Sequence, residues 1–409
     1  MNRRNFIIAI FFYAALSLGC DEAGIENSAV RTGAEILIEN HLDELSGKRV
    51  GLVMNPTARI GDTHMLDTLL SREINITALF APEHGFRGEA GAGERIEDGI
   101  DRATGLPVFS LYGSTRKPTP EMLEHVDLLL FDMQDVGARF YTYIATLGLV
   151  MEAAAEAELP VWILDRPNPL GGDLVSGWMM EEQHKSFVGP YPIPILHGLT
   201  MGEMAAMIAG ENWMEFENEP EIRVIKMNGW SRDMKWPDTS LDWIPPSPNL
   251  GTFAQTFIYP GTVFLEGTSM SEGRGTDEPF LLLGDPSINP DLLDIDRLNE
   301  LSDGFSVEPA EFTPRSIPGV APNPKHLGEH CYGIRIRVHH YDFDPVKAGL
   351  AIFKELLEAA ESKEMKPFLY LLTGSELVDR YLQDETELSE LQFEPVDFME
   401  QRRPYLLYE

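Results

Sequence analysis

The sequence is short of basic residues, and this shortage narrows the range of partners. Its 409 residues include 32 Lys and Arg against 66 Asp and Glu, a formal net charge of −34. A nucleic-acid-binding surface gains affinity when Lys and Arg displace counterions from phosphates, and the chain contains no cluster of basic residues. We therefore expect no nucleic-acid partner.

Cysteine is equally scarce, because Cys20 and Cys331 are the only two in the chain. The first lies in an N-terminal targeting segment, so we expect no disulfide in the mature protein. A lone cysteine such as Cys331 usually packs as a small buried hydrophobic residue.

The N-terminal segment is typical of a bacterial lipoprotein signal. Arg3 and Arg4 precede an apolar run at residues 6–16, which is too short for a membrane span. Residues 17–20 (SLGC) resemble a lipobox, although Ser17 stands where Leu is more usual. We predict cleavage before Cys20 and its lipidation, and hence an exported protein of the periplasm or outer membrane that touches the membrane only through its lipid. An ordinary secretory peptide is the alternative.

The remaining sequence has the composition of a globular protein, with 43% hydrophobic and 24% charged residues. After a tether at residues 21–30, short apolar runs alternate with helical segments, the best of which is residues 142–158. The runs lie at residues 50–54, 76–80, 108–112, 126–131 and 161–164. Such alternation predicts an α/β fold with a mostly parallel sheet flanked by helices.

A proline-rich stretch at residues 236–260 marks a candidate domain boundary. We place the first domain at residues 31–252 and a smaller α+β domain at residues 253–409. Within the second domain, the patterns predict helices at residues 292–301 and 345–362 and a strand at residues 332–340.

Polar clusters follow four of the five apolar runs. They begin at Asn55, Glu83, Asp132 and Asp165. Because ligands bind beyond the carboxyl ends of parallel strands, these clusters favour a site at one edge of the sheet. Carboxylates dominate the clusters, and hydrolysis of a glycosidic bond needs a carboxyl acid with a second carboxylate. We choose Glu83 as the acid, since nearby apolar residues would raise its pKa; the alternative is a structural ion pair between Glu83 and Arg87.

Two other chemistries have weaker support. His84, Asp132, Asp135 and His197 are possible metal ligands, but the chain has no HExxH motif and no paired cysteines. The glycine-rich residues 88–93 lack the lysine of a phosphate-binding loop. We therefore expect neither a metal nor a cofactor.

A second polar cluster lies at residues 259–276, beyond the proline-rich stretch. It contains Glu266, Glu272 and Arg274 among several glycines, and a guanidinium there would suit a substrate carboxylate. The alternative is that the glycines only form turns. Between the two clusters, His197 precedes a predicted helix start, with Thr200 as its cap and Glu203 as the capping partner.

Six ordered motifs carry a resemblance over nearly the whole mature chain. They are PEHGFRG (82–88), FDMQDVGARFYTY (131–143), LDRPNPLGG (164–172), HGLTMGE (197–203), YPGT (259–262) and EGTSMSEGRGT (266–276). Together they resemble the NamZ family of exo-β-N-acetylmuramidases. The resemblance implies a Rossmann-like domain, a smaller C-terminal domain, and an active site in the cleft between them.

The same resemblance implies that N-acetylmuramic acid is released from the non-reducing ends of peptidoglycan strands or fragments. Glu83 is then the leading catalytic residue, and we take Glu272 as the second carboxylate. The other expected pocket residues are Asn55, His84, Arg87, Asp132, Asp135, Arg139, Tyr141, Arg166, His197 and Arg274. Because muramic acid carries a lactyl carboxylate, Arg139 or Arg274 is expected to bind it.

Aromatic residues Tyr141, Phe86 and Phe140 are candidates for stacking on sugars, although Phe86 and Phe140 equally suit the core. Two rival functions stay open at this point. One is a non-catalytic sugar-binding lipoprotein of the same fold, and the other is a metal-dependent amidase or deacetylase acting on cell-wall fragments.

Overall fold

The computed structural model describes residues 29–87 and 98–409. The predicted signal segment with Cys20, and the glycine-rich residues 88–93, lie outside the described residues. Among the residues that are described, no helix is long and apolar enough to cross a membrane.

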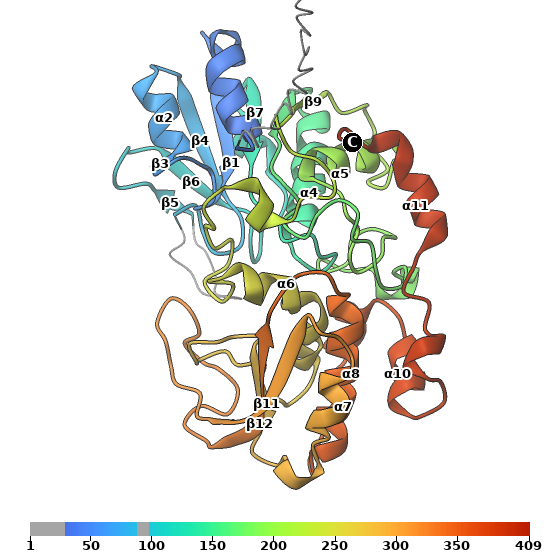
Figure 1. The fold of residues 1–409 in the computed structure, drawn as a ribbon. Coiled ribbons are helices and arrows are strands. Elements are labelled where there is room, and N and C mark those ends of the chain that lie inside the picture. Colours follow the sequence, from blue (N-terminus) through green and yellow to red (C-terminus); the bar gives the residue numbers. More distant parts are fainter. Residues whose placement is uncertain (1–28, 88–97) are drawn as a thin grey trace, which may run out of the picture.

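A seven-stranded sheet forms the centre of the N-terminal domain (Figure 1). Its strand order is β5-β6-β4-β1-β7-β8-β9, and every neighbouring pair is parallel except β5 with β6. The strands are β1 (Val50–Met54), β4 (Ile76–Ala81), β5 (Gly99–Ile100), β6 (Pro107–Ser110), β7 (Leu128–Asp132), β8 (Val161–Leu164) and β9 (Ile222–Ile225). The five predicted strands are confirmed, whereas the short edge strands β5 and β9 were missed. A small hairpin, β2 (Arg59–Ile60) with β3 (Thr63–His64), lies beside the sheet.

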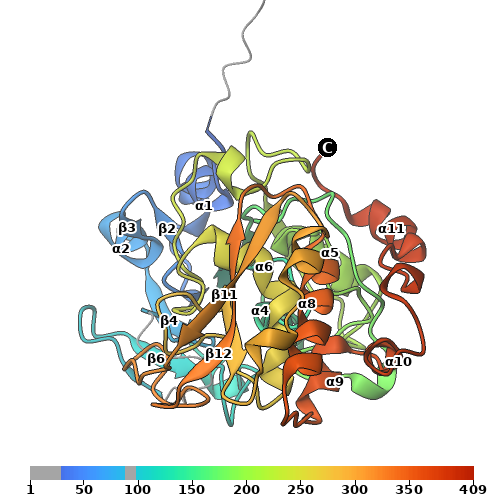
Figure 2. The ribbon, with the colours of Figure 1, turned by 60° about the horizontal axis from the view of Figure 1, so that its bottom comes forward.

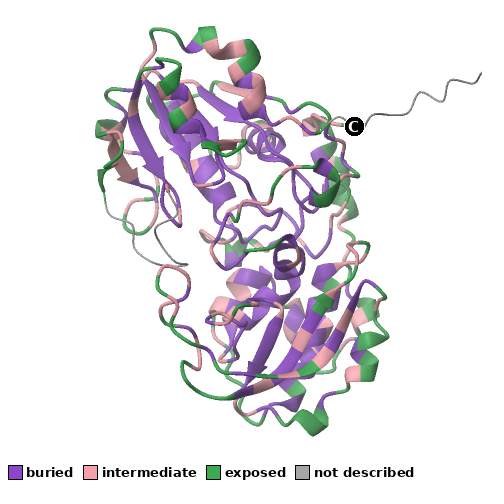
Figure 3. Cartoon of the chain, turned by 60° about the vertical axis from the view of Figure 1, so that its left-hand side comes forward, coloured by how far each residue is buried: buried purple, intermediate pink, exposed green. Residues whose placement is uncertain are grey.

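The central strands are almost entirely apolar because both faces of the sheet are covered. In β7, Leu128 and Leu130 join one buried cluster, while Leu129 and Phe131 join the other. This alternation follows from side chains pointing to opposite faces of a strand. The covering helices are α1 (Gly33–Ile36), α2 (Met65–Ser71), α3 (Pro120–Leu123), α4 (Tyr143–Glu156) and α5 (Met201–Gly210). Figure 3 shows the resulting continuous burial of the strands.

The predicted start of α5 is confirmed. The Thr200 hydroxyl accepts from the Glu203 backbone N–H at 3.2 Å, and the Glu203 carboxylate accepts from the Thr200 N–H at 3.0 Å. This reciprocal capping satisfies backbone donors that a helix leaves free at its first turn.

The smaller C-terminal domain contains an antiparallel sheet of β10 (Leu282–Asp285), β12 (Cys331–Val338) and β11 (Phe305–Phe312), in that order. Figure 2 shows α6 and α8 beside this sheet. The helices are α6 (Phe253–Thr262), α7 (Ile295–Asn299), α8 (Pro345–Ala359), α9 (Phe368–Thr373) and α10 (Leu377–Leu382). The predicted α/β fold with a smaller α+β domain is confirmed, and the boundary at residue 252 stays a prediction.

Two glycines set the contact between α6 and α8. A Cβ atom on Gly261 would lie 1.9 Å from the Pro345 carbonyl oxygen, and one on Gly349 would lie 2.2 Å from the Gly261 carbonyl carbon. The two backbones therefore approach more closely than any side chain allows. This accounts for the glycine of the YPGT motif.

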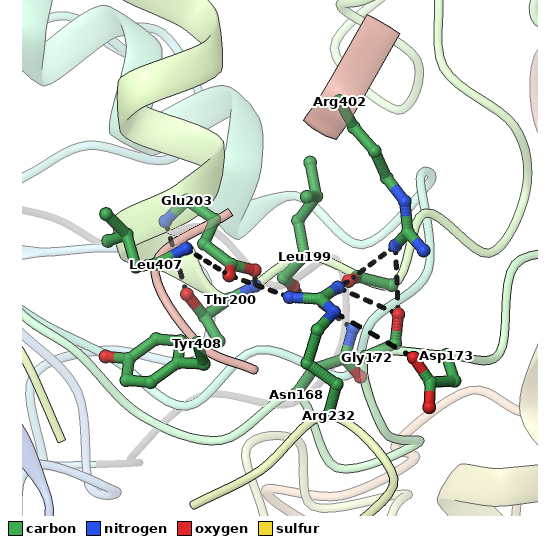
Figure 4. A network of polar contacts seen from close by, with 12 residues as sticks. Asn168, Gly172, Asp173, Leu199, Thr200, Glu203, Arg232, Arg402, Leu407 and Tyr408 are labelled. Atoms are coloured by element: carbon green, nitrogen blue, oxygen red, sulfur yellow. Dashed lines mark hydrogen bonds and ion pairs between the residues drawn. The ribbon is translucent and has the colours of Figure 1, made fainter. Parts of the chain in front are cut away.

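The chain ends on the N-terminal domain. Helix α11 (Val396–Arg402) lies beside α5, and the last residues enter a buried polar network (Figures 1 and 4). Glu203 accepts from the Arg232 guanidinium at 2.7 Å and from the Leu407 N–H at 2.9 Å. Arg402 donates to the carbonyl oxygens of Gly172 and Gly198, each at 2.9 Å.

Glu203→Ala should lower the free energy of unfolding by about 3–5 kcal/mol, because it leaves the buried Arg232 charge without its carboxylate. Urea unfolding measures this value. The exposed Glu217→Ala is the control and should change it by less than about 0.5 kcal/mol. A loss below about 1 kcal/mol in Glu203→Ala would show that the network does not stabilise the fold in this way.

Candidate active site

A cavity of about 550 Å³ collects residues from both domains. The N-terminal domain contributes residues that follow β4, β6 and β7, and thus the carboxyl edge of the parallel sheet, as predicted. They are Glu83, His84, Tyr112, Phe140, Tyr141 and Thr142. The C-terminal domain contributes Tyr259, Glu266, Glu272, Arg274, Phe280 and the loop residues 320–325.

Glu83 lies half-buried on the N-terminal wall, in the turn after β4. The Thr142 hydroxyl, at the start of α4, donates to its Oε2 at 2.9 Å. Burial, followed by the charge of Glu83 and a hydrogen bond to it, raises the pKa of Tyr112. Glu83 is thus oriented by hydroxyl groups from two separate loops.

The opposite wall carries two carboxylates and two cations in one chain of ion pairs. Arg274 lies 2.7 Å from Glu266 and 3.3 Å from Glu272, and the Lys325 ammonium lies 2.9 Å from Glu272. Lys325 also donates to the carbonyl oxygens of Leu265 and Met270 at 2.7 and 2.8 Å. About a fifth of each cationic side chain stays exposed, 19% for Arg274 and 22% for Lys325, so both can meet a ligand in the cavity.

The pKa values of the two carboxyl groups are shifted in opposite directions. Burial raises the pKa of Glu266, and the charge of Arg274 does not overcome this effect. Burial also acts to raise the pKa of Glu272, but the charges of Lys325 and Arg274 outweigh it and lower that pKa. Glu272 is therefore the more acidic of the two carboxylic acids.

Two residues of the cavity have a backbone conformation that non-glycine residues rarely adopt. His84 has φ 72° and Phe280 has φ 64°, both in the left-handed region. Strained conformations of this kind concentrate at functional sites. Phe280 packs edge-on against Tyr259, with ring centroids 4.8 Å apart, and lies under Arg274 at 5.2 Å.

Five of the predicted site residues line the cavity, namely Glu83, His84, Tyr141, Glu272 and Arg274. Tyr141 and Phe140 both pack edge-on against Tyr259, at 6.3 and 5.5 Å. Phe86 instead packs against His64 at 5.2 Å and belongs to a buried cluster. These placements agree with the predicted pocket, while the catalytic roles stay predictions.

The structure places the other predicted residues outside the cavity lining. Asp132 and Arg166 form a buried ion pair at 2.5 Å, and Asn55 donates to the Tyr143 hydroxyl at 2.8 Å. The Arg87 guanidinium binds Asp101, with its Nε 2.7 Å from Oδ1. These contacts hold loops at the sheet edge together.

Arg139, Asp135 and His197 are likewise buried away from the lining. Arg139 is 0% exposed and donates to four backbone carbonyl oxygens, two of them at the end of α9 (Leu372 and Thr373). Asp135 accepts from the Gly137 N–H at 2.7 Å, and burial raises its pKa to about 7. Burial, with the charges of Arg402 and Arg139, lowers the pKa of His197 to about 3. Arg139 therefore joins the two domains and leaves Arg274 as the predicted arginine that faces the cavity.

Several residues that line the cavity were not predicted from the sequence. Lys325 lies in a proline-rich loop between β11 and β12. The sequence of this loop does not indicate the ion pair that Lys325 forms with Glu272. Tyr112 is the last residue of a predicted strand and Thr142 is the first residue of the predicted helix, so the strand-edge rule is the signal that could have found them. Glu266 is the first residue of the motif EGTSMSEGRGT, but no catalytic or binding role was predicted for it.

Within residues 29–87 and 98–409, no group of three or more His, Cys, Asp or Glu side chains is arranged to hold a metal ion. The expectation that neither a metal nor a cofactor takes part stays a prediction.

Family models and a known enzyme are similar in sequence to most of this chain. Residues 50–254 match the family model described as exo-β-N-acetylmuramidase NamZ, N-terminal, and residues 257–408 match its C-terminal counterpart. The peptidoglycan β-N-acetylmuramidase NamZ of Bacillus subtilis is 44% identical over 350 residues, which are 85% of this chain and 81% of that protein.

Two crystal structures of DUF1343 family proteins from Bacteroides fragilis are also similar. They have TM-scores of 0.83 and 0.77 with 35% and 34% identity, and each comparison covers 93% of this chain and 99% of the other. The resemblance predicted from the six motifs is confirmed: the chain belongs to the NamZ family of exo-β-N-acetylmuramidases and is a glycoside hydrolase.

Proposed function

We propose that this chain releases N-acetylmuramic acid from the non-reducing ends of peptidoglycan strands or their fragments. The observation that carries the proposal is the shared cavity, in which Glu83 faces a wall holding Arg274 and Lys325. A carboxyl group to break the glycosidic bond and cations to bind the substrate carboxylate thus border one space. The Bacillus subtilis relative, named for peptidoglycan β-N-acetylmuramidase activity, supports the same substrate.

Arg274 and Lys325 provide the binding site for the lactyl carboxylate in this proposal. They are the partly exposed cations of the cavity, whereas the Arg139 guanidinium is fully buried and occupied by carbonyl oxygens. N-acetylglucosamine lacks the lactyl group, so these cations would distinguish the two sugars of the glycan.

Hydrolysis then proceeds by acid catalysis at Glu83. The protonated Glu83 donates to the glycosidic oxygen as the bond from that oxygen to C1 breaks, and positive charge develops on the muramoyl ring. The ionised Glu272 stabilises this charge. Water adds its oxygen to C1, and the proton that it releases restores the acid form of Glu83.

We further propose that the protein is exported and anchored through a lipid on Cys20. The basic residues, short apolar run and lipobox-like residues 17–20 support this assignment. Mass spectrometry of the N-terminal peptide should find an acylated Cys20 in the wild type and no acylation in Cys20→Ala. An unmodified, uncleaved N-terminus in the wild type would contradict the proposal.

Glu83→Gln should lower turnover at least about a hundredfold, because the amide cannot donate the proton. Release of chromophore from para-nitrophenyl N-acetyl-β-muramide measures the rate, with the exposed Glu217→Gln as control. Unchanged turnover would remove Glu83 from the mechanism.

A wild type that binds muramyl sugars without cleaving them would favour the sugar-binding rival. Loss of activity with a chelator would favour the metal-dependent amidase or deacetylase.

Arg274→Ala should lower kcat/KM for the muramide roughly 10- to 100-fold more than for the matching N-acetylglucosaminide, since a charge-assisted contact to the lactyl group is lost. Arg274→Lys should recover part of the difference. Arg335→Ala removes an arginine that pairs with Glu278 and Glu308 and serves as the control. Equal losses on both substrates would contradict the lactyl-binding role.

Lys325→Met should raise the pKa of Glu272, because one of the two cations that lower it is removed. In the wild type, the stabilising contribution of Glu272 is present above its unfolded pKa and is lost as pH falls through its lower folded pKa. The variant should lose this contribution at a higher pH. Carbon-13 NMR of the carboxyl group measures the titration, with the exposed Lys347→Met as control; an unshifted titration would contradict the assignment.

A further inference from the structure

A second cavity, of about 770 Å³, lies beside the first. Its lining includes the loop after β6, the loop around Phe187, part of α4, and residues that follow α5. None of the residues proposed for catalysis or for lactyl binding lies in its lining.

One wall separates the two cavities. Tyr112 and Val188 line the first cavity, and their chain neighbours Gly113 and Phe187 line the second. The rings of Tyr112 and Phe187 lie 6.4 Å apart, and the Arg116 guanidinium lies over the Phe187 ring at 4.3 Å. A ligand that leaves the first cavity over Tyr112 therefore meets Phe187 and Arg116 next.

The second cavity is rich in cations, in a chain with twice as many acidic as basic residues. Arg116, Lys117 and Lys185 line it, against a single carboxylate, Glu215. Lys117 is held by acidic residues of α4, at 3.0 Å from Glu152 and 2.6 Å from Glu156, and the exposed Lys185 lies 3.7 Å from Glu182. Arg116 is exposed and, within the described part of the chain, forms no ion pair. The Arg116 guanidinium therefore favours an anionic ligand.

The position of Glu83 indicates on which side of the cleaved glycosidic bond the ligand of the second cavity lies. A general acid protonates the oxygen of the leaving sugar, so the leaving strand must extend from the side where Glu83 lies. Tyr112, which hydrogen-bonds Glu83, forms the wall toward the second cavity. The second cavity is thus on the leaving-group side.

We propose that the second cavity binds the leaving glycan strand through a carboxylate on its next muramoyl residue. This inference rests on the proposed function. In a strand of alternating sugars, carboxylates recur on every second sugar, either as a free lactyl group or on an attached peptide. Arg116, whose guanidinium lies over the Phe187 ring, and Lys185 bind that carboxylate.

The test compares two peptide-free substrates, the disaccharide MurNAc-GlcNAc and the tetrasaccharide that repeats it once. The full-length wild type should show a higher kcat/KM for the tetrasaccharide. In the double variant Arg116→Gln/Lys185→Gln, the ratio of the two values should fall roughly tenfold, because a charge-assisted contact is lost. Lys347→Gln, an exposed lysine elsewhere, should keep the wild-type ratio.

A third substrate, the tetrasaccharide with a peptide on its second muramoyl residue, identifies the source of the carboxylate. A preference only for this substrate assigns the site to the peptide carboxylates, and a preference for the peptide-free tetrasaccharide assigns it to the lactyl group. Cleavage of all substrates without a length preference, or an unchanged ratio in the folded double variant, would overturn the second site alone. Failure to cleave even the chromogenic muramide would overturn the proposed function itself.

Discussion

The candidate site depends on keeping two cations charged and in place on a largely buried wall. Removing a charge from water costs several kcal/mol unless a partner compensates, and Arg274 and Lys325 are compensated by Glu266 and Glu272. Loss of Glu272 would leave Lys325 without a carboxylate partner, and loss of Glu266 would leave both cations to share Glu272. The carboxylates are therefore as necessary for binding an anionic sugar as the cations are, and they explain how two cations can be kept on a largely buried wall.

The wall that carries Arg274 and Lys325 can act together with Glu83 only if the two domains keep their relative position, because Glu83 lies on the other domain. Several contacts hold the domains in register: the Arg139 guanidinium binds carbonyl oxygens at the end of α9, and the C-terminal segment enters the network around Glu203 and Arg232. These buried contacts join specific partners, so they favour a single relative arrangement of the two domains. The polar motifs thus divide into those that touch the cavity and those that position its walls.

The sequence predicted the parts of the fold that depend on local pattern. Strands β1, β4, β7 and β8 are apolar on both faces and were recognised, whereas β9 is a short, half-buried edge strand with an arginine. The edge of the sheet that carries the site was also predicted. The rule for strand ends does not say which side chains turn into the cavity, so Asp132 and Asp135 were grouped with Glu83 although they hold loops together. Lys325 could not be found, because its partner Glu272 lies 53 positions earlier in the chain and only tertiary structure joins them.

A crystal structure of Glu83→Gln with bound MurNAc-GlcNAc would test this account most directly. The account predicts the muramoyl residue in the cavity between the domains, its lactyl carboxylate against Arg274 and Lys325, and the glycosidic oxygen within hydrogen-bonding distance of residue 83. A disaccharide bound in the reverse direction, or with its carboxylate away from both cations, would contradict it.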